Sequence, residues 1–224
     1  MRMVCITDLH GDPASLDRIL SHAGPADVVL LGGDITSFGT PNAAEFLARQ
    51  AMQHGAQVLA VAGNCDSAAI DARLADLGMS LFGRGVTLQG VGFYGVSAMP
   101  PWTGTMYELS EDEIGAALRA GRGQLAQPQL EVVLSHTPPR GTQLDRTRRG
   151  EHVGSLAVRQ FVEQVQPALL LCGHIHEARG IDRLDATTIV NCGPAYEGYY
   201  AVADVDADVQ VELVHVRACA GSGR

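Results

Sequence analysis

The sequence of 224 residues lacks the features that would assign it to a membrane or secreted class. Its apolar stretches all fall short of the roughly 18–20 residues that a transmembrane helix needs, so we expect no segment to cross a membrane. Residues 1–7 have neither the basic region nor the cleavage pattern of a signal peptide. The five cysteines are odd in number and form no paired framework, which favours reduced thiols and a cytoplasmic protein.

Basic residues are scarce relative to acidic ones. The chain has 16 Lys and Arg against 25 Asp and Glu, which gives a formal net charge of −9 at pH 7. Nucleic-acid binding without sequence preference needs a basic face that neutralises phosphates, so we expect no strong nucleic-acid binding. We therefore expect hydrolysis of a small diester rather than nuclease activity on polymers, and a local basic lip around the site would overturn this expectation.

No linker or internal repeat divides the chain. With 46% hydrophobic residues, the sequence predicts a single domain over residues 1–216, burying roughly 70% of the surface of its unfolded chain. We expect residues 217–224 to fray, because chain ends are seldom held by other parts of a fold. Whether the protein forms homo-oligomers stays open.

The most informative segment is Gly-His-Ile-His-Glu at residues 173–177. It follows an apolar run over residues 168–172 that is typical of a buried strand. Alternate side chains of a strand point to the same face, so the rings of His174 and His176 can point the same way. Neutral imidazole is the commonest metal ligand, and strand ends in α/β proteins open into ligand-binding crevices. The segment therefore predicts part of a metal site.

Four other polar motifs each follow a short apolar run that reads as a strand, namely residues 1–7, 27–31, 57–62 and 130–134. Because the carboxyl ends of parallel strands lie along one edge, we expect these motifs to converge. Each motif alone is more often turn chemistry, a helix cap or an ordinary loop, but the repeated placement favours a common site. The motifs are Asp8-Leu9-His10, Gly33-Asp34, Gly63-Asn64 and Ser135-His136-Thr137.

The ordered set DLH, GGD, GNCD, SHTPP and GHIHE resembles the calcineurin-like metallophosphoesterase superfamily. The match runs from residue 8 to residue 176. The resemblance implies an α/β fold, a four-layer α/β/β/α sandwich of two mixed β-sheets flanked by helices. It also implies two metal ions. One would be bound by Asp8, His10, Asp34 and His176, and the other by Asp34, Asn64, His136 and His174, with Asp34 bridging.

The chemistry of these side chains agrees with such a site. A mixed set of carboxylate, amide and imidazole donors suits Mn²⁺, which we expect first, or Fe, Zn²⁺ or Ni²⁺. A carboxylate shared between two cations about 3.5–4 Å apart offsets their repulsion. Metal binding can lower the pKa of a bridging water from about 15.7 to about 7. The resulting hydroxide is the expected nucleophile.

Cys65 departs from the common superfamily pattern, in which a histidine follows Gly-Asn and is credited with protonating the leaving oxygen. The GNCD variant resembles a subset of small bacterial phosphodiesterases. A free thiol with a pKa of about 8.5 is a weaker proton donor than an imidazolium. Our hypothesis is that Cys65 takes this catalytic place and thereby favours aryl and other acidic leaving groups. The alternative is a small packed residue after a strand.

The segment over residues 140–155 offers further candidates. His152 lies just ahead of a predicted helix and is a second candidate proton donor. Arg148 and Arg149 belong to a basic cluster that can bind a substrate phosphate. Arginine runs are more often solvated loops, so this alternative stays open. We also expect Asn64 to contact the substrate in addition to binding metal.

The remaining pattern predicts alternating strands and helices. Helical periodicity covers residues 41–54, 67–77 and 155–166, and a capping box at Ser110 starts another helix toward residue 120. Residues 187–191, 199–204 and 209–216 alternate like an antiparallel meander that completes the second sheet. The Pro-rich segment 97–104, with Trp102, is a plain crossover, a lid or an oligomer contact.

Three classes of function follow. The leading prediction is a dinuclear metal-dependent phosphoesterase that hydrolyses small phosphodiesters, aryl or nucleotide-like. A phosphomonoesterase or a phosphoprotein phosphatase is the alternative, although residues 33–38 lack the arginine that phosphoprotein phosphatases carry near this position. The third class is a non-catalytic metal-binding scaffold of the same fold, which the complete ligand set disfavours.

Overall fold

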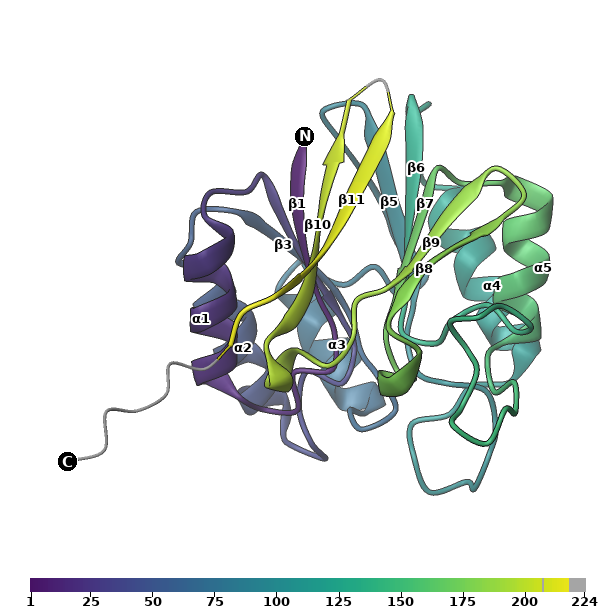
Figure 1. The fold of residues 1–224 in the computed structure, drawn as a ribbon, viewed down its shortest axis with the longest axis horizontal. Helices are drawn as coiled ribbons and strands as arrows, with labels where there is room; N and C mark the ends of the chain where they lie inside the picture. Colours follow the sequence, from purple (N-terminus) through teal and green to yellow (C-terminus); the bar gives the residue numbers. More distant parts are fainter. Residues whose placement is uncertain (207, 218–224) are drawn as a thin grey trace.

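Two mixed β-sheets pack face to face in the computed structural model, which describes residues 1–206 and 208–217 (Figure 1). The first sheet contains β1 (Arg2–Ile6), β2 (Val28–Gly32), β3 (Gln57–Val61), β10 (Tyr199–Val205) and β11 (Val209–His215). The second contains β4 (Gly85–Leu88), β5 (Val91–Val96), β6 (Leu130–Ser135), β7 (Leu169–Cys172), β8 (Gly180–Leu184) and β9 (Thr187–Asn191). Their strand orders are β11-β10-β1-β2-β3 and β4-β5-β6-β7-β9-β8.

Helices cover the outer face of each sheet, which confirms the predicted four-layer α/β/β/α sandwich (Figure 1). The first sheet is covered by α1 (Pro13–Ala23), α2 (Pro41–Met52) and α3 (Ala68–Asp76), and the second by α4 (Glu111–Arg122) and α5 (Leu156–Val165). Short 3-10 turns, η1 (His176–Ala178) and η2 (Ala195–Glu197), follow β7 and β9. Most of the predicted fraying tail, residues 218–224, lies outside the described residues.

Strand β1 shows how the sequence builds these layers. Its alternate side chains point to opposite faces, as in any strand. Val4 and Ile6 join the core under α1 and α2, whereas Met3 and Cys5 join the core between the two sheets. All four side chains are buried, so β1 reads as a continuous apolar run rather than an alternating one.

The starts of the helices are fixed by their caps. The Asp12 side chain accepts hydrogen bonds from the backbone of Ala14 and Ser15, with Pro13 at the first helical position. Ser110 and Glu113 form the predicted capping box of α4. The helices predicted over 41–54, 67–77 and 155–166 correspond to α2, α3 and α5, with ends that differ by one or two residues.

The prediction that the last three strands form a meander completing the second sheet is wrong. Only β9 lies in that sheet, parallel to β7 and antiparallel to β8, a strand that the prediction missed. Strands β10 and β11 instead extend the first sheet, with β10 antiparallel to β1. Alternation of apolar residues reports which faces of a strand are buried and carries no information about its partner strand, so the pairing could not be inferred.

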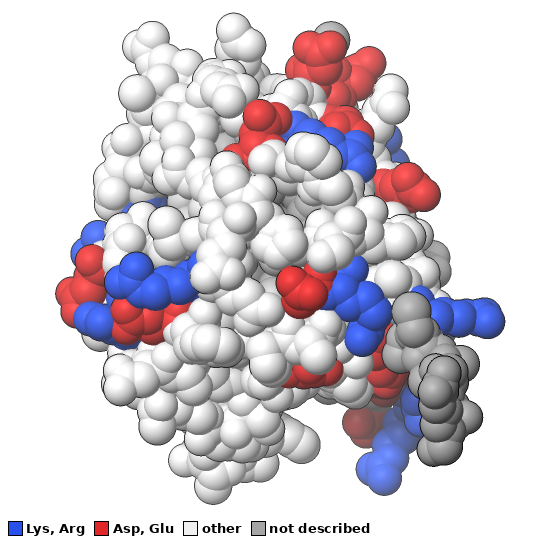
Figure 2. Space-filling model, turned by 90° about the vertical axis from the view of Figure 1, so that its left-hand side faces the viewer, with Lys and Arg blue, Asp and Glu red and all other residues white. Residues whose placement is uncertain are grey.

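One face of the molecule illustrates the distribution of charge. Figure 2 shows the side on which α1 lies, where blue and red side chains sit next to one another rather than in separate fields. Glu45 of α2 pairs with Arg49 at 2.6 Å and with Arg73 of α3 at 2.5 Å. Paired charges of this kind do not make the continuous basic surface that phosphate backbones require. Among the described residues, no helix is long and apolar enough to span a bilayer.

Candidate metal centre

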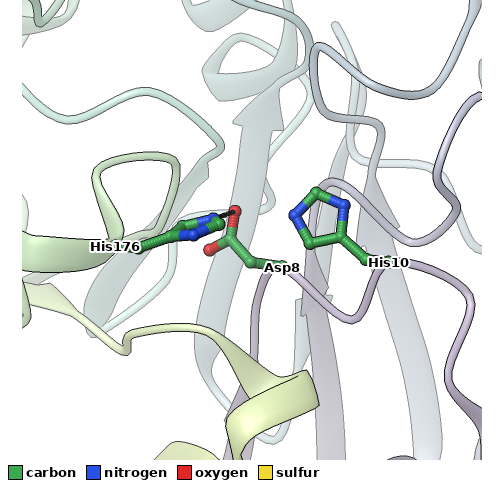
Figure 3. Close-up of side chains that lie close together, drawn as sticks. All are labelled: Asp8, His10 and His176. Atoms are coloured by element: carbon green, nitrogen blue, oxygen red, sulfur yellow. Dashed lines mark ion pairs between the residues drawn. The ribbon is translucent and has the colours of Figure 1, made fainter.

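The side chains predicted to bind metal come together where β1, β2, β3, β6 and β7 end. The Nε2 atom of His176 lies 3.4 Å from Oδ1 of Asp8. Figure 3 shows the Asp8 carboxylate between the rings of His176 and His10. These three residues form one of the groups whose ligand atoms lie within 4.8 Å of one another, and Asp8, Asp34 and His136 form another. The predicted convergence of separate strand ends therefore describes this edge correctly.

Asp34 lies between two sets of imidazoles. Its Oδ2 is 3.8 Å from Nε2 of His10, and its Oδ1 is 3.5 Å from Nε2 of His136. The same His136 nitrogen is 2.9 Å from Oδ1 of Asn64. His174 packs against His136 with ring centroids 5.1 Å apart. A carboxylate with one oxygen toward each set has the arrangement that a bridging ligand needs.

Four of the predicted ligands have left-handed backbone conformations, with φ of 54° at Asp8, 50° at His10, 46° at Asp34 and 67° at His174. Such conformations cost a non-glycine residue free energy and persist only where neighbouring contacts fix them. Asp8 donates its N–H to Gly33 O at 3.0 Å, and His10 donates to Asp34 O at 2.8 Å. The His174 N–H donates to both Asp8 oxygens at 3.1 Å. The turns are thus held by backbone hydrogen bonds that also orient a ligand carboxylate.

The glycines preceding three of the ligands allow chain segments to approach closely. A Cβ atom at Gly63 would collide with the backbone nitrogen and Oδ1 of Asp34. One at Gly173 would collide with Oδ2 of Asp8, and one at Gly33 with the His136 ring. A side chain at any of these glycines would displace a ligand from another strand. These contacts join segments that lie far apart in the chain, and the sequence analysis did not predict them.

Asp66, the last residue of the GNCD motif, joins two ligand loops. Its buried carboxylate accepts hydrogen bonds from the N–H of Ile35 at 3.0 Å, of Thr36 at 2.9 Å and of Gly63 at 2.9 Å. It also accepts from the Thr36 hydroxyl at 2.7 Å. Burial, together with the nearby charge of Asp34, raises the pKa of Asp66. The residue holds the loops after β2 and β3 in register, a role that sequence reasoning missed.

The electrostatics of the cluster fit divalent cations. The Asp8 and Asp34 residues are 0% and 3% exposed, and their ion-pair partners among the described residues are all histidines, with no arginine. Buried carboxylates without a cationic partner are costly, and metal ions would offset that cost. Burial, with a smaller effect of His136, lowers the pKa of His174 to about 3. Its imidazole is therefore neutral at pH 7, which is the form that binds metals.

Comparison with known proteins identifies the family. The model of the calcineurin-like phosphoesterase family matches residues 1–178. This chain belongs to that family. The uncharacterized protein MJ1162 of Methanocaldococcus jannaschii is 32% identical over 202 residues, which cover 87% of this chain and 88% of that protein. The UPF0046 protein K07C11.7 of Caenorhabditis elegans is 30% identical over 115 residues, which cover 51% of this chain and 37% of the worm protein.

Solved structures share the fold at low sequence identity. TT1561 of Thermus thermophilus superposes with a TM-score of 0.75 at 18% identity, covering 96% of this chain and 99% of that one. A dimetal phosphatase from Danio rerio superposes with a TM-score of 0.66 at 13% identity, with 97% of each chain covered. Membership of the family supports hydrolysis of phosphoesters and binding of divalent metals by the Asp and His clusters.

Cys65 lies next to two of the predicted ligands. Its ligand atom forms a group with those of His10 and Asp34, all within 4.8 Å of one another. The Cys65 N–H donates to Oδ1 of Asp34 at 2.7 Å, and its Sγ is 3.3 Å from Nδ2 of Asn64. Burial first, and then the negative charge of Asp34, raise the pKa of the Cys65 thiol. A thiol with a raised pKa is a poor proton donor. This agrees with the hypothesis that Cys65 favours acidic leaving groups, which need little protonation.

The loop over residues 140–155 is anchored by the carboxylate of Asp145. The His152 ring contacts the buried Asp145 carboxylate, with Nδ1 and Oδ1 2.7 Å apart. That carboxylate also accepts from the backbone of Gly141, Thr142 and Gly154, at 3.0 Å each. Among the described residues, neither a hydrogen bond nor an ion pair joins His152 to a predicted ligand. Its predicted role as a proton donor therefore gains no support from these contacts.

The two arginines of the predicted phosphate cluster differ in position. Arg148 lines a cavity of about 220 Å³ together with His176, and its backbone N–H donates to the Glu177 carboxylate at 3.0 Å. Arg149 is exposed and lines no part of that cavity. The structure therefore brings Arg148, and not Arg149, beside a predicted ligand.

Tyr196, in η2, is a site residue that sequence reasoning missed. Its ring packs edge-on against those of His10 and His176, with centroids 5.5 and 5.7 Å apart. Its hydroxyl is 3.4 Å from Nδ1 of His176. Partners of this kind orient metal-binding imidazoles. The segment Pro194-Ala195-Tyr196-Glu197-Gly198 reads only as a turn, so the sequence carried no signal for this contact.

Proposed function

We propose that this chain is a dinuclear metal-dependent phosphoesterase that hydrolyses small phosphodiesters with aryl or nucleotide-like leaving groups. The observation that carries the proposal is Asp34, whose two carboxylate oxygens face His10 and His136 separately. Mn²⁺ is the metal we expect, and Fe, Zn²⁺ or Ni²⁺ would suit the same mixed donor set. A cytoplasmic location and the state of association remain predictions from the sequence.

The donor set divides into two groups around Asp34. When bound, two divalent ions would supply Lewis acidity at the phosphoryl group and lower the pKa of a coordinated water toward about 7. The chain itself keeps the His174 ring neutral through burial and fixes the Asp8 carboxylate through the His174 N–H. The proposed ligands are Asp8, His10, Asp34 and His176 for one ion, and Asp34, Asn64, His136 and His174 for the other.

The side-chain amide nitrogen of Asn64 is available to donate a hydrogen bond to the substrate. Its Oδ1 faces His136, and its Nδ2 faces two sulfur atoms, Sγ of Cys65 at 3.3 Å and Sδ of Met106 at 3.4 Å. Sulfur is a weak hydrogen-bond acceptor, so a phosphoryl oxygen would replace either contact favourably. This arrangement supports a substrate contact for Asn64 in addition to its role as a ligand.

The preference for a diester over a monoester rests on the number of available cations. Arg148 and Arg179 line the cavity next to His176. Arg179 already donates to the carbonyls of Cys192 and Val214 and lies over the Tyr199 ring, which leaves Arg148 for the substrate. A phosphodiester carries one negative charge and a monoester carries close to two at pH 7. One arginine beside the proposed ions suits the diester better.

The test is metal-dependent turnover. We expect protein stripped with a chelator and reloaded with Mn²⁺ to bind two ions per chain, measured by elemental analysis, and to hydrolyse bis(4-nitrophenyl) phosphate faster than 4-nitrophenyl phosphate. Faster hydrolysis of the monoester would favour a phosphomonoesterase. Two bound ions without hydrolysis of either ester would favour a metal-binding scaffold.

The role of Cys65 has its own test. Replacement Cys65→His introduces a better proton donor and should raise the rate on alkyl diesters more than on aryl diesters, because only the alkyl leaving group needs strong protonation. Cys65→Ala is the matched control, since it removes the thiol without adding an imidazole. A ratio of aryl to alkyl rates that is the same in the parent chain and in Cys65→His would refute the role.

A further inference from the structure

Phe38 is the residue at the site that the proposed function leaves unexplained. Its side chain is 65% exposed, and its backbone has φ of 54°. For a bulky residue this conformation is a genuine outlier that costs on the order of 1–3 kcal/mol. The exposed ring gains little packing in return. Strain held at a ligand-bearing loop without a packing benefit is typical of a binding residue.

The conformation of Phe38 is fixed by the neighbouring ligand loop. Its N–H donates to the carbonyl oxygen of Cys65 at 2.8 Å. Next to it, the Gly39 N–H donates to Thr36 Oγ1 at 3.1 Å, and that hydroxyl donates to Asp66 at 2.7 Å. The loop after β2 is therefore tied to the GNCD segment at several points, and it holds the Phe38 ring beside residues 64–66.

A second loop reaches the same place from the other sheet. Met106 lies between β5 and α4, and its Sδ atom is 3.4 Å from the Asn64 amide nitrogen. The Tyr107 N–H donates to the Asn64 carbonyl oxygen at 3.0 Å, and the Tyr107 hydroxyl donates to buried Asp71 at 2.8 Å. These bonds dock the loop onto the segment that carries Asn64 and Cys65.

A cavity of about 280 Å³ lies between the two loops. Asp66 also faces it, but its oxygens are occupied by the hydrogen bonds of Ile35, Thr36 and Gly63. A cavity below the size of typical drug-like sites, with an aromatic ring and a thioether in its wall, suits one aromatic ring. The other lining residues are Phe38, Ser67, Ala68, Thr105, Met106 and Tyr107.

We propose that this cavity binds the aromatic group of the phosphodiester substrate, an aryl ring joined directly to an ester oxygen, in contact with Phe38 and Met106. The inference rests on the proposed function and specifies its substrate class. Met106 contacts the side-chain amide of Asn64, which we expect to bind the phosphoryl group. The cavity therefore begins close enough to the phosphorus for a ring on an ester oxygen to enter it. Thioether and aromatic contacts of this kind favour a ring over an aliphatic group of similar size.

The experiment separates recognition of the ring from acidity of the leaving group. Methyl phenyl phosphate and methyl hexafluoroisopropyl phosphate release alcohols of similar acidity, and only the first carries a ring. With the Mn²⁺-loaded full chain, we expect Phe38→Ala and Met106→Ala to raise KM for the phenyl ester about tenfold, or about 1.4 kcal/mol. KM for the ring-free ester should change less than twofold. Equal changes for both esters, or no change for either, would overturn the proposal.

Matched variants exclude a general effect of losing an exposed aromatic or of misfolding. Phe46→Ala removes a phenylalanine on α2 that is 60% exposed and lines no part of the cavity, and it should leave both KM values unchanged. Phe38→Gly relieves the left-handed backbone, so it should melt at or above the parent temperature and still lose the ring preference. A lower melting temperature for Phe38→Gly would make Phe38 a structural residue and contradict the proposal.

A binding measurement that needs no turnover distinguishes failure of the proposed activity from failure of the aromatic site. Phenylphosphonate should bind the Mn²⁺-loaded chain about tenfold more tightly than methylphosphonate in calorimetry, and Phe38→Ala should abolish the difference. If neither ester is hydrolysed but this difference is found, the proposed activity fails and the aromatic site stands. Equal binding of the two phosphonates overturns the site. A Phe38-dependent KM for methyl thymidine 5′-phosphate with none for the phenyl ester would also overturn it, because the occupant would then be a nucleobase.

Discussion

The buried ligand loops differ in construction from the rim, by which we mean the loop that carries Phe38 and the loop over residues 97–109. Asp8, Asp34 and His136 are almost completely buried, and their backbones are fixed by hydrogen bonds and by glycine contacts with other strands. Phe38 and Trp102, which belong to these two loops, are 65% and 75% exposed. The arrangement of the proposed metal ligands is therefore fixed by many contacts of the fold, whereas the contacts that would choose a substrate depend on a few loop residues.

The two regions are nevertheless joined. The loop over residues 97–109 is held at one end by Ser97, whose hydroxyl donates to buried Asp71 at 2.8 Å and accepts from the Ala62 N–H at 2.9 Å. Tyr107 donates to the other oxygen of the same carboxylate. Of the roles that the sequence left open for residues 97–104, the structure therefore shows a loop anchored at both sides. A role for Trp102 in association between chains stays a prediction.

The strongest test of the buried region is Asp34→Asn. The amide keeps the size of the carboxylate but loses the charge that would hold the two proposed cations, so we expect metal-dependent turnover to fall on the order of 10³-fold, as loss of several kcal/mol implies. Elemental analysis should show fewer than two ions per chain. Asp12→Asn is the control, because asparagine caps a helix as well as aspartate does. Two retained ions with full turnover would remove Asp34 from the centre.

The next test probes the close approach of the ligand loops. Gly63→Ala places a Cβ against the backbone nitrogen of Asp34, so we expect a loss of about 1–3 kcal/mol in the free energy of unfolding, measured with urea. Metal content should fall as well, because Asp34 is displaced. Gly115→Ala in α4 is the matched control, since the nearest atom to its Cβ is the flexible end of Arg119 at 3.0 Å. Equal stability of the two variants would contradict the close-approach argument.

Asp71, which joins the rim to the core, gives a pH-dependent test. Burial, as the main cause, raises its pKa from 3.8 to about 6. The folded chain therefore holds this proton more tightly than the unfolded chain, and the stability that it contributes below pH 4 is lost as pH rises through 6. Roughly two pKa units correspond to at most about 3 kcal/mol. Asp71→Asn should gain stability relative to the parent between pH 4 and pH 7, measured by urea unfolding.

A matched variant separates this effect from the general titration of surface carboxylates. Asp76 lies on the same helix, α3, and is exposed. Its replacement by asparagine should leave the difference from the parent chain nearly constant over the same pH range. If Asp71→Asn and Asp76→Asn behave alike, the carboxylate of Asp71 does not carry a raised pKa in the folded chain.

The sequence was sufficient to predict that the proposed ligands lie at one edge, because each stands at the end of an apolar run and the carboxyl ends of parallel strands meet at one edge. The start of α4 could be predicted for a similar reason, since the Ser110 cap acts on the residues next to it. Both signals are local in sequence. This locality explains why the five strand ends and the α/β/β/α layers agree with the structure.

Contacts between distant segments could not be predicted. The partner of β10 is β1, about 200 residues away, and nothing in the alternation of β10 indicates it. Gly63 reads as a turn glycine until Asp34 is found against it, and Tyr196 reads as a turn residue until it meets His176. The strain at Phe38 depends on its backbone dihedral angles, which the sequence does not reveal. Tertiary proximity decides each of these cases.

The smallest expected effect compares two neighbouring arginines. Arg148 lines the cavity that contains His176, and Arg149 does not. We expect Arg148→Ala to raise KM for a phosphodiester by a few-fold, because an exposed charge interaction contributes about 0.2–1 kcal/mol. Added salt should shrink this difference, since exposed charges are screened over about 10 Å at 0.1 M. Arg149→Ala should leave KM unchanged, and kinetics at two salt concentrations check both variants. If the two replacements raise KM equally, the two arginines attract phosphate through their charge alone, and Arg148 makes no defined contact with the substrate.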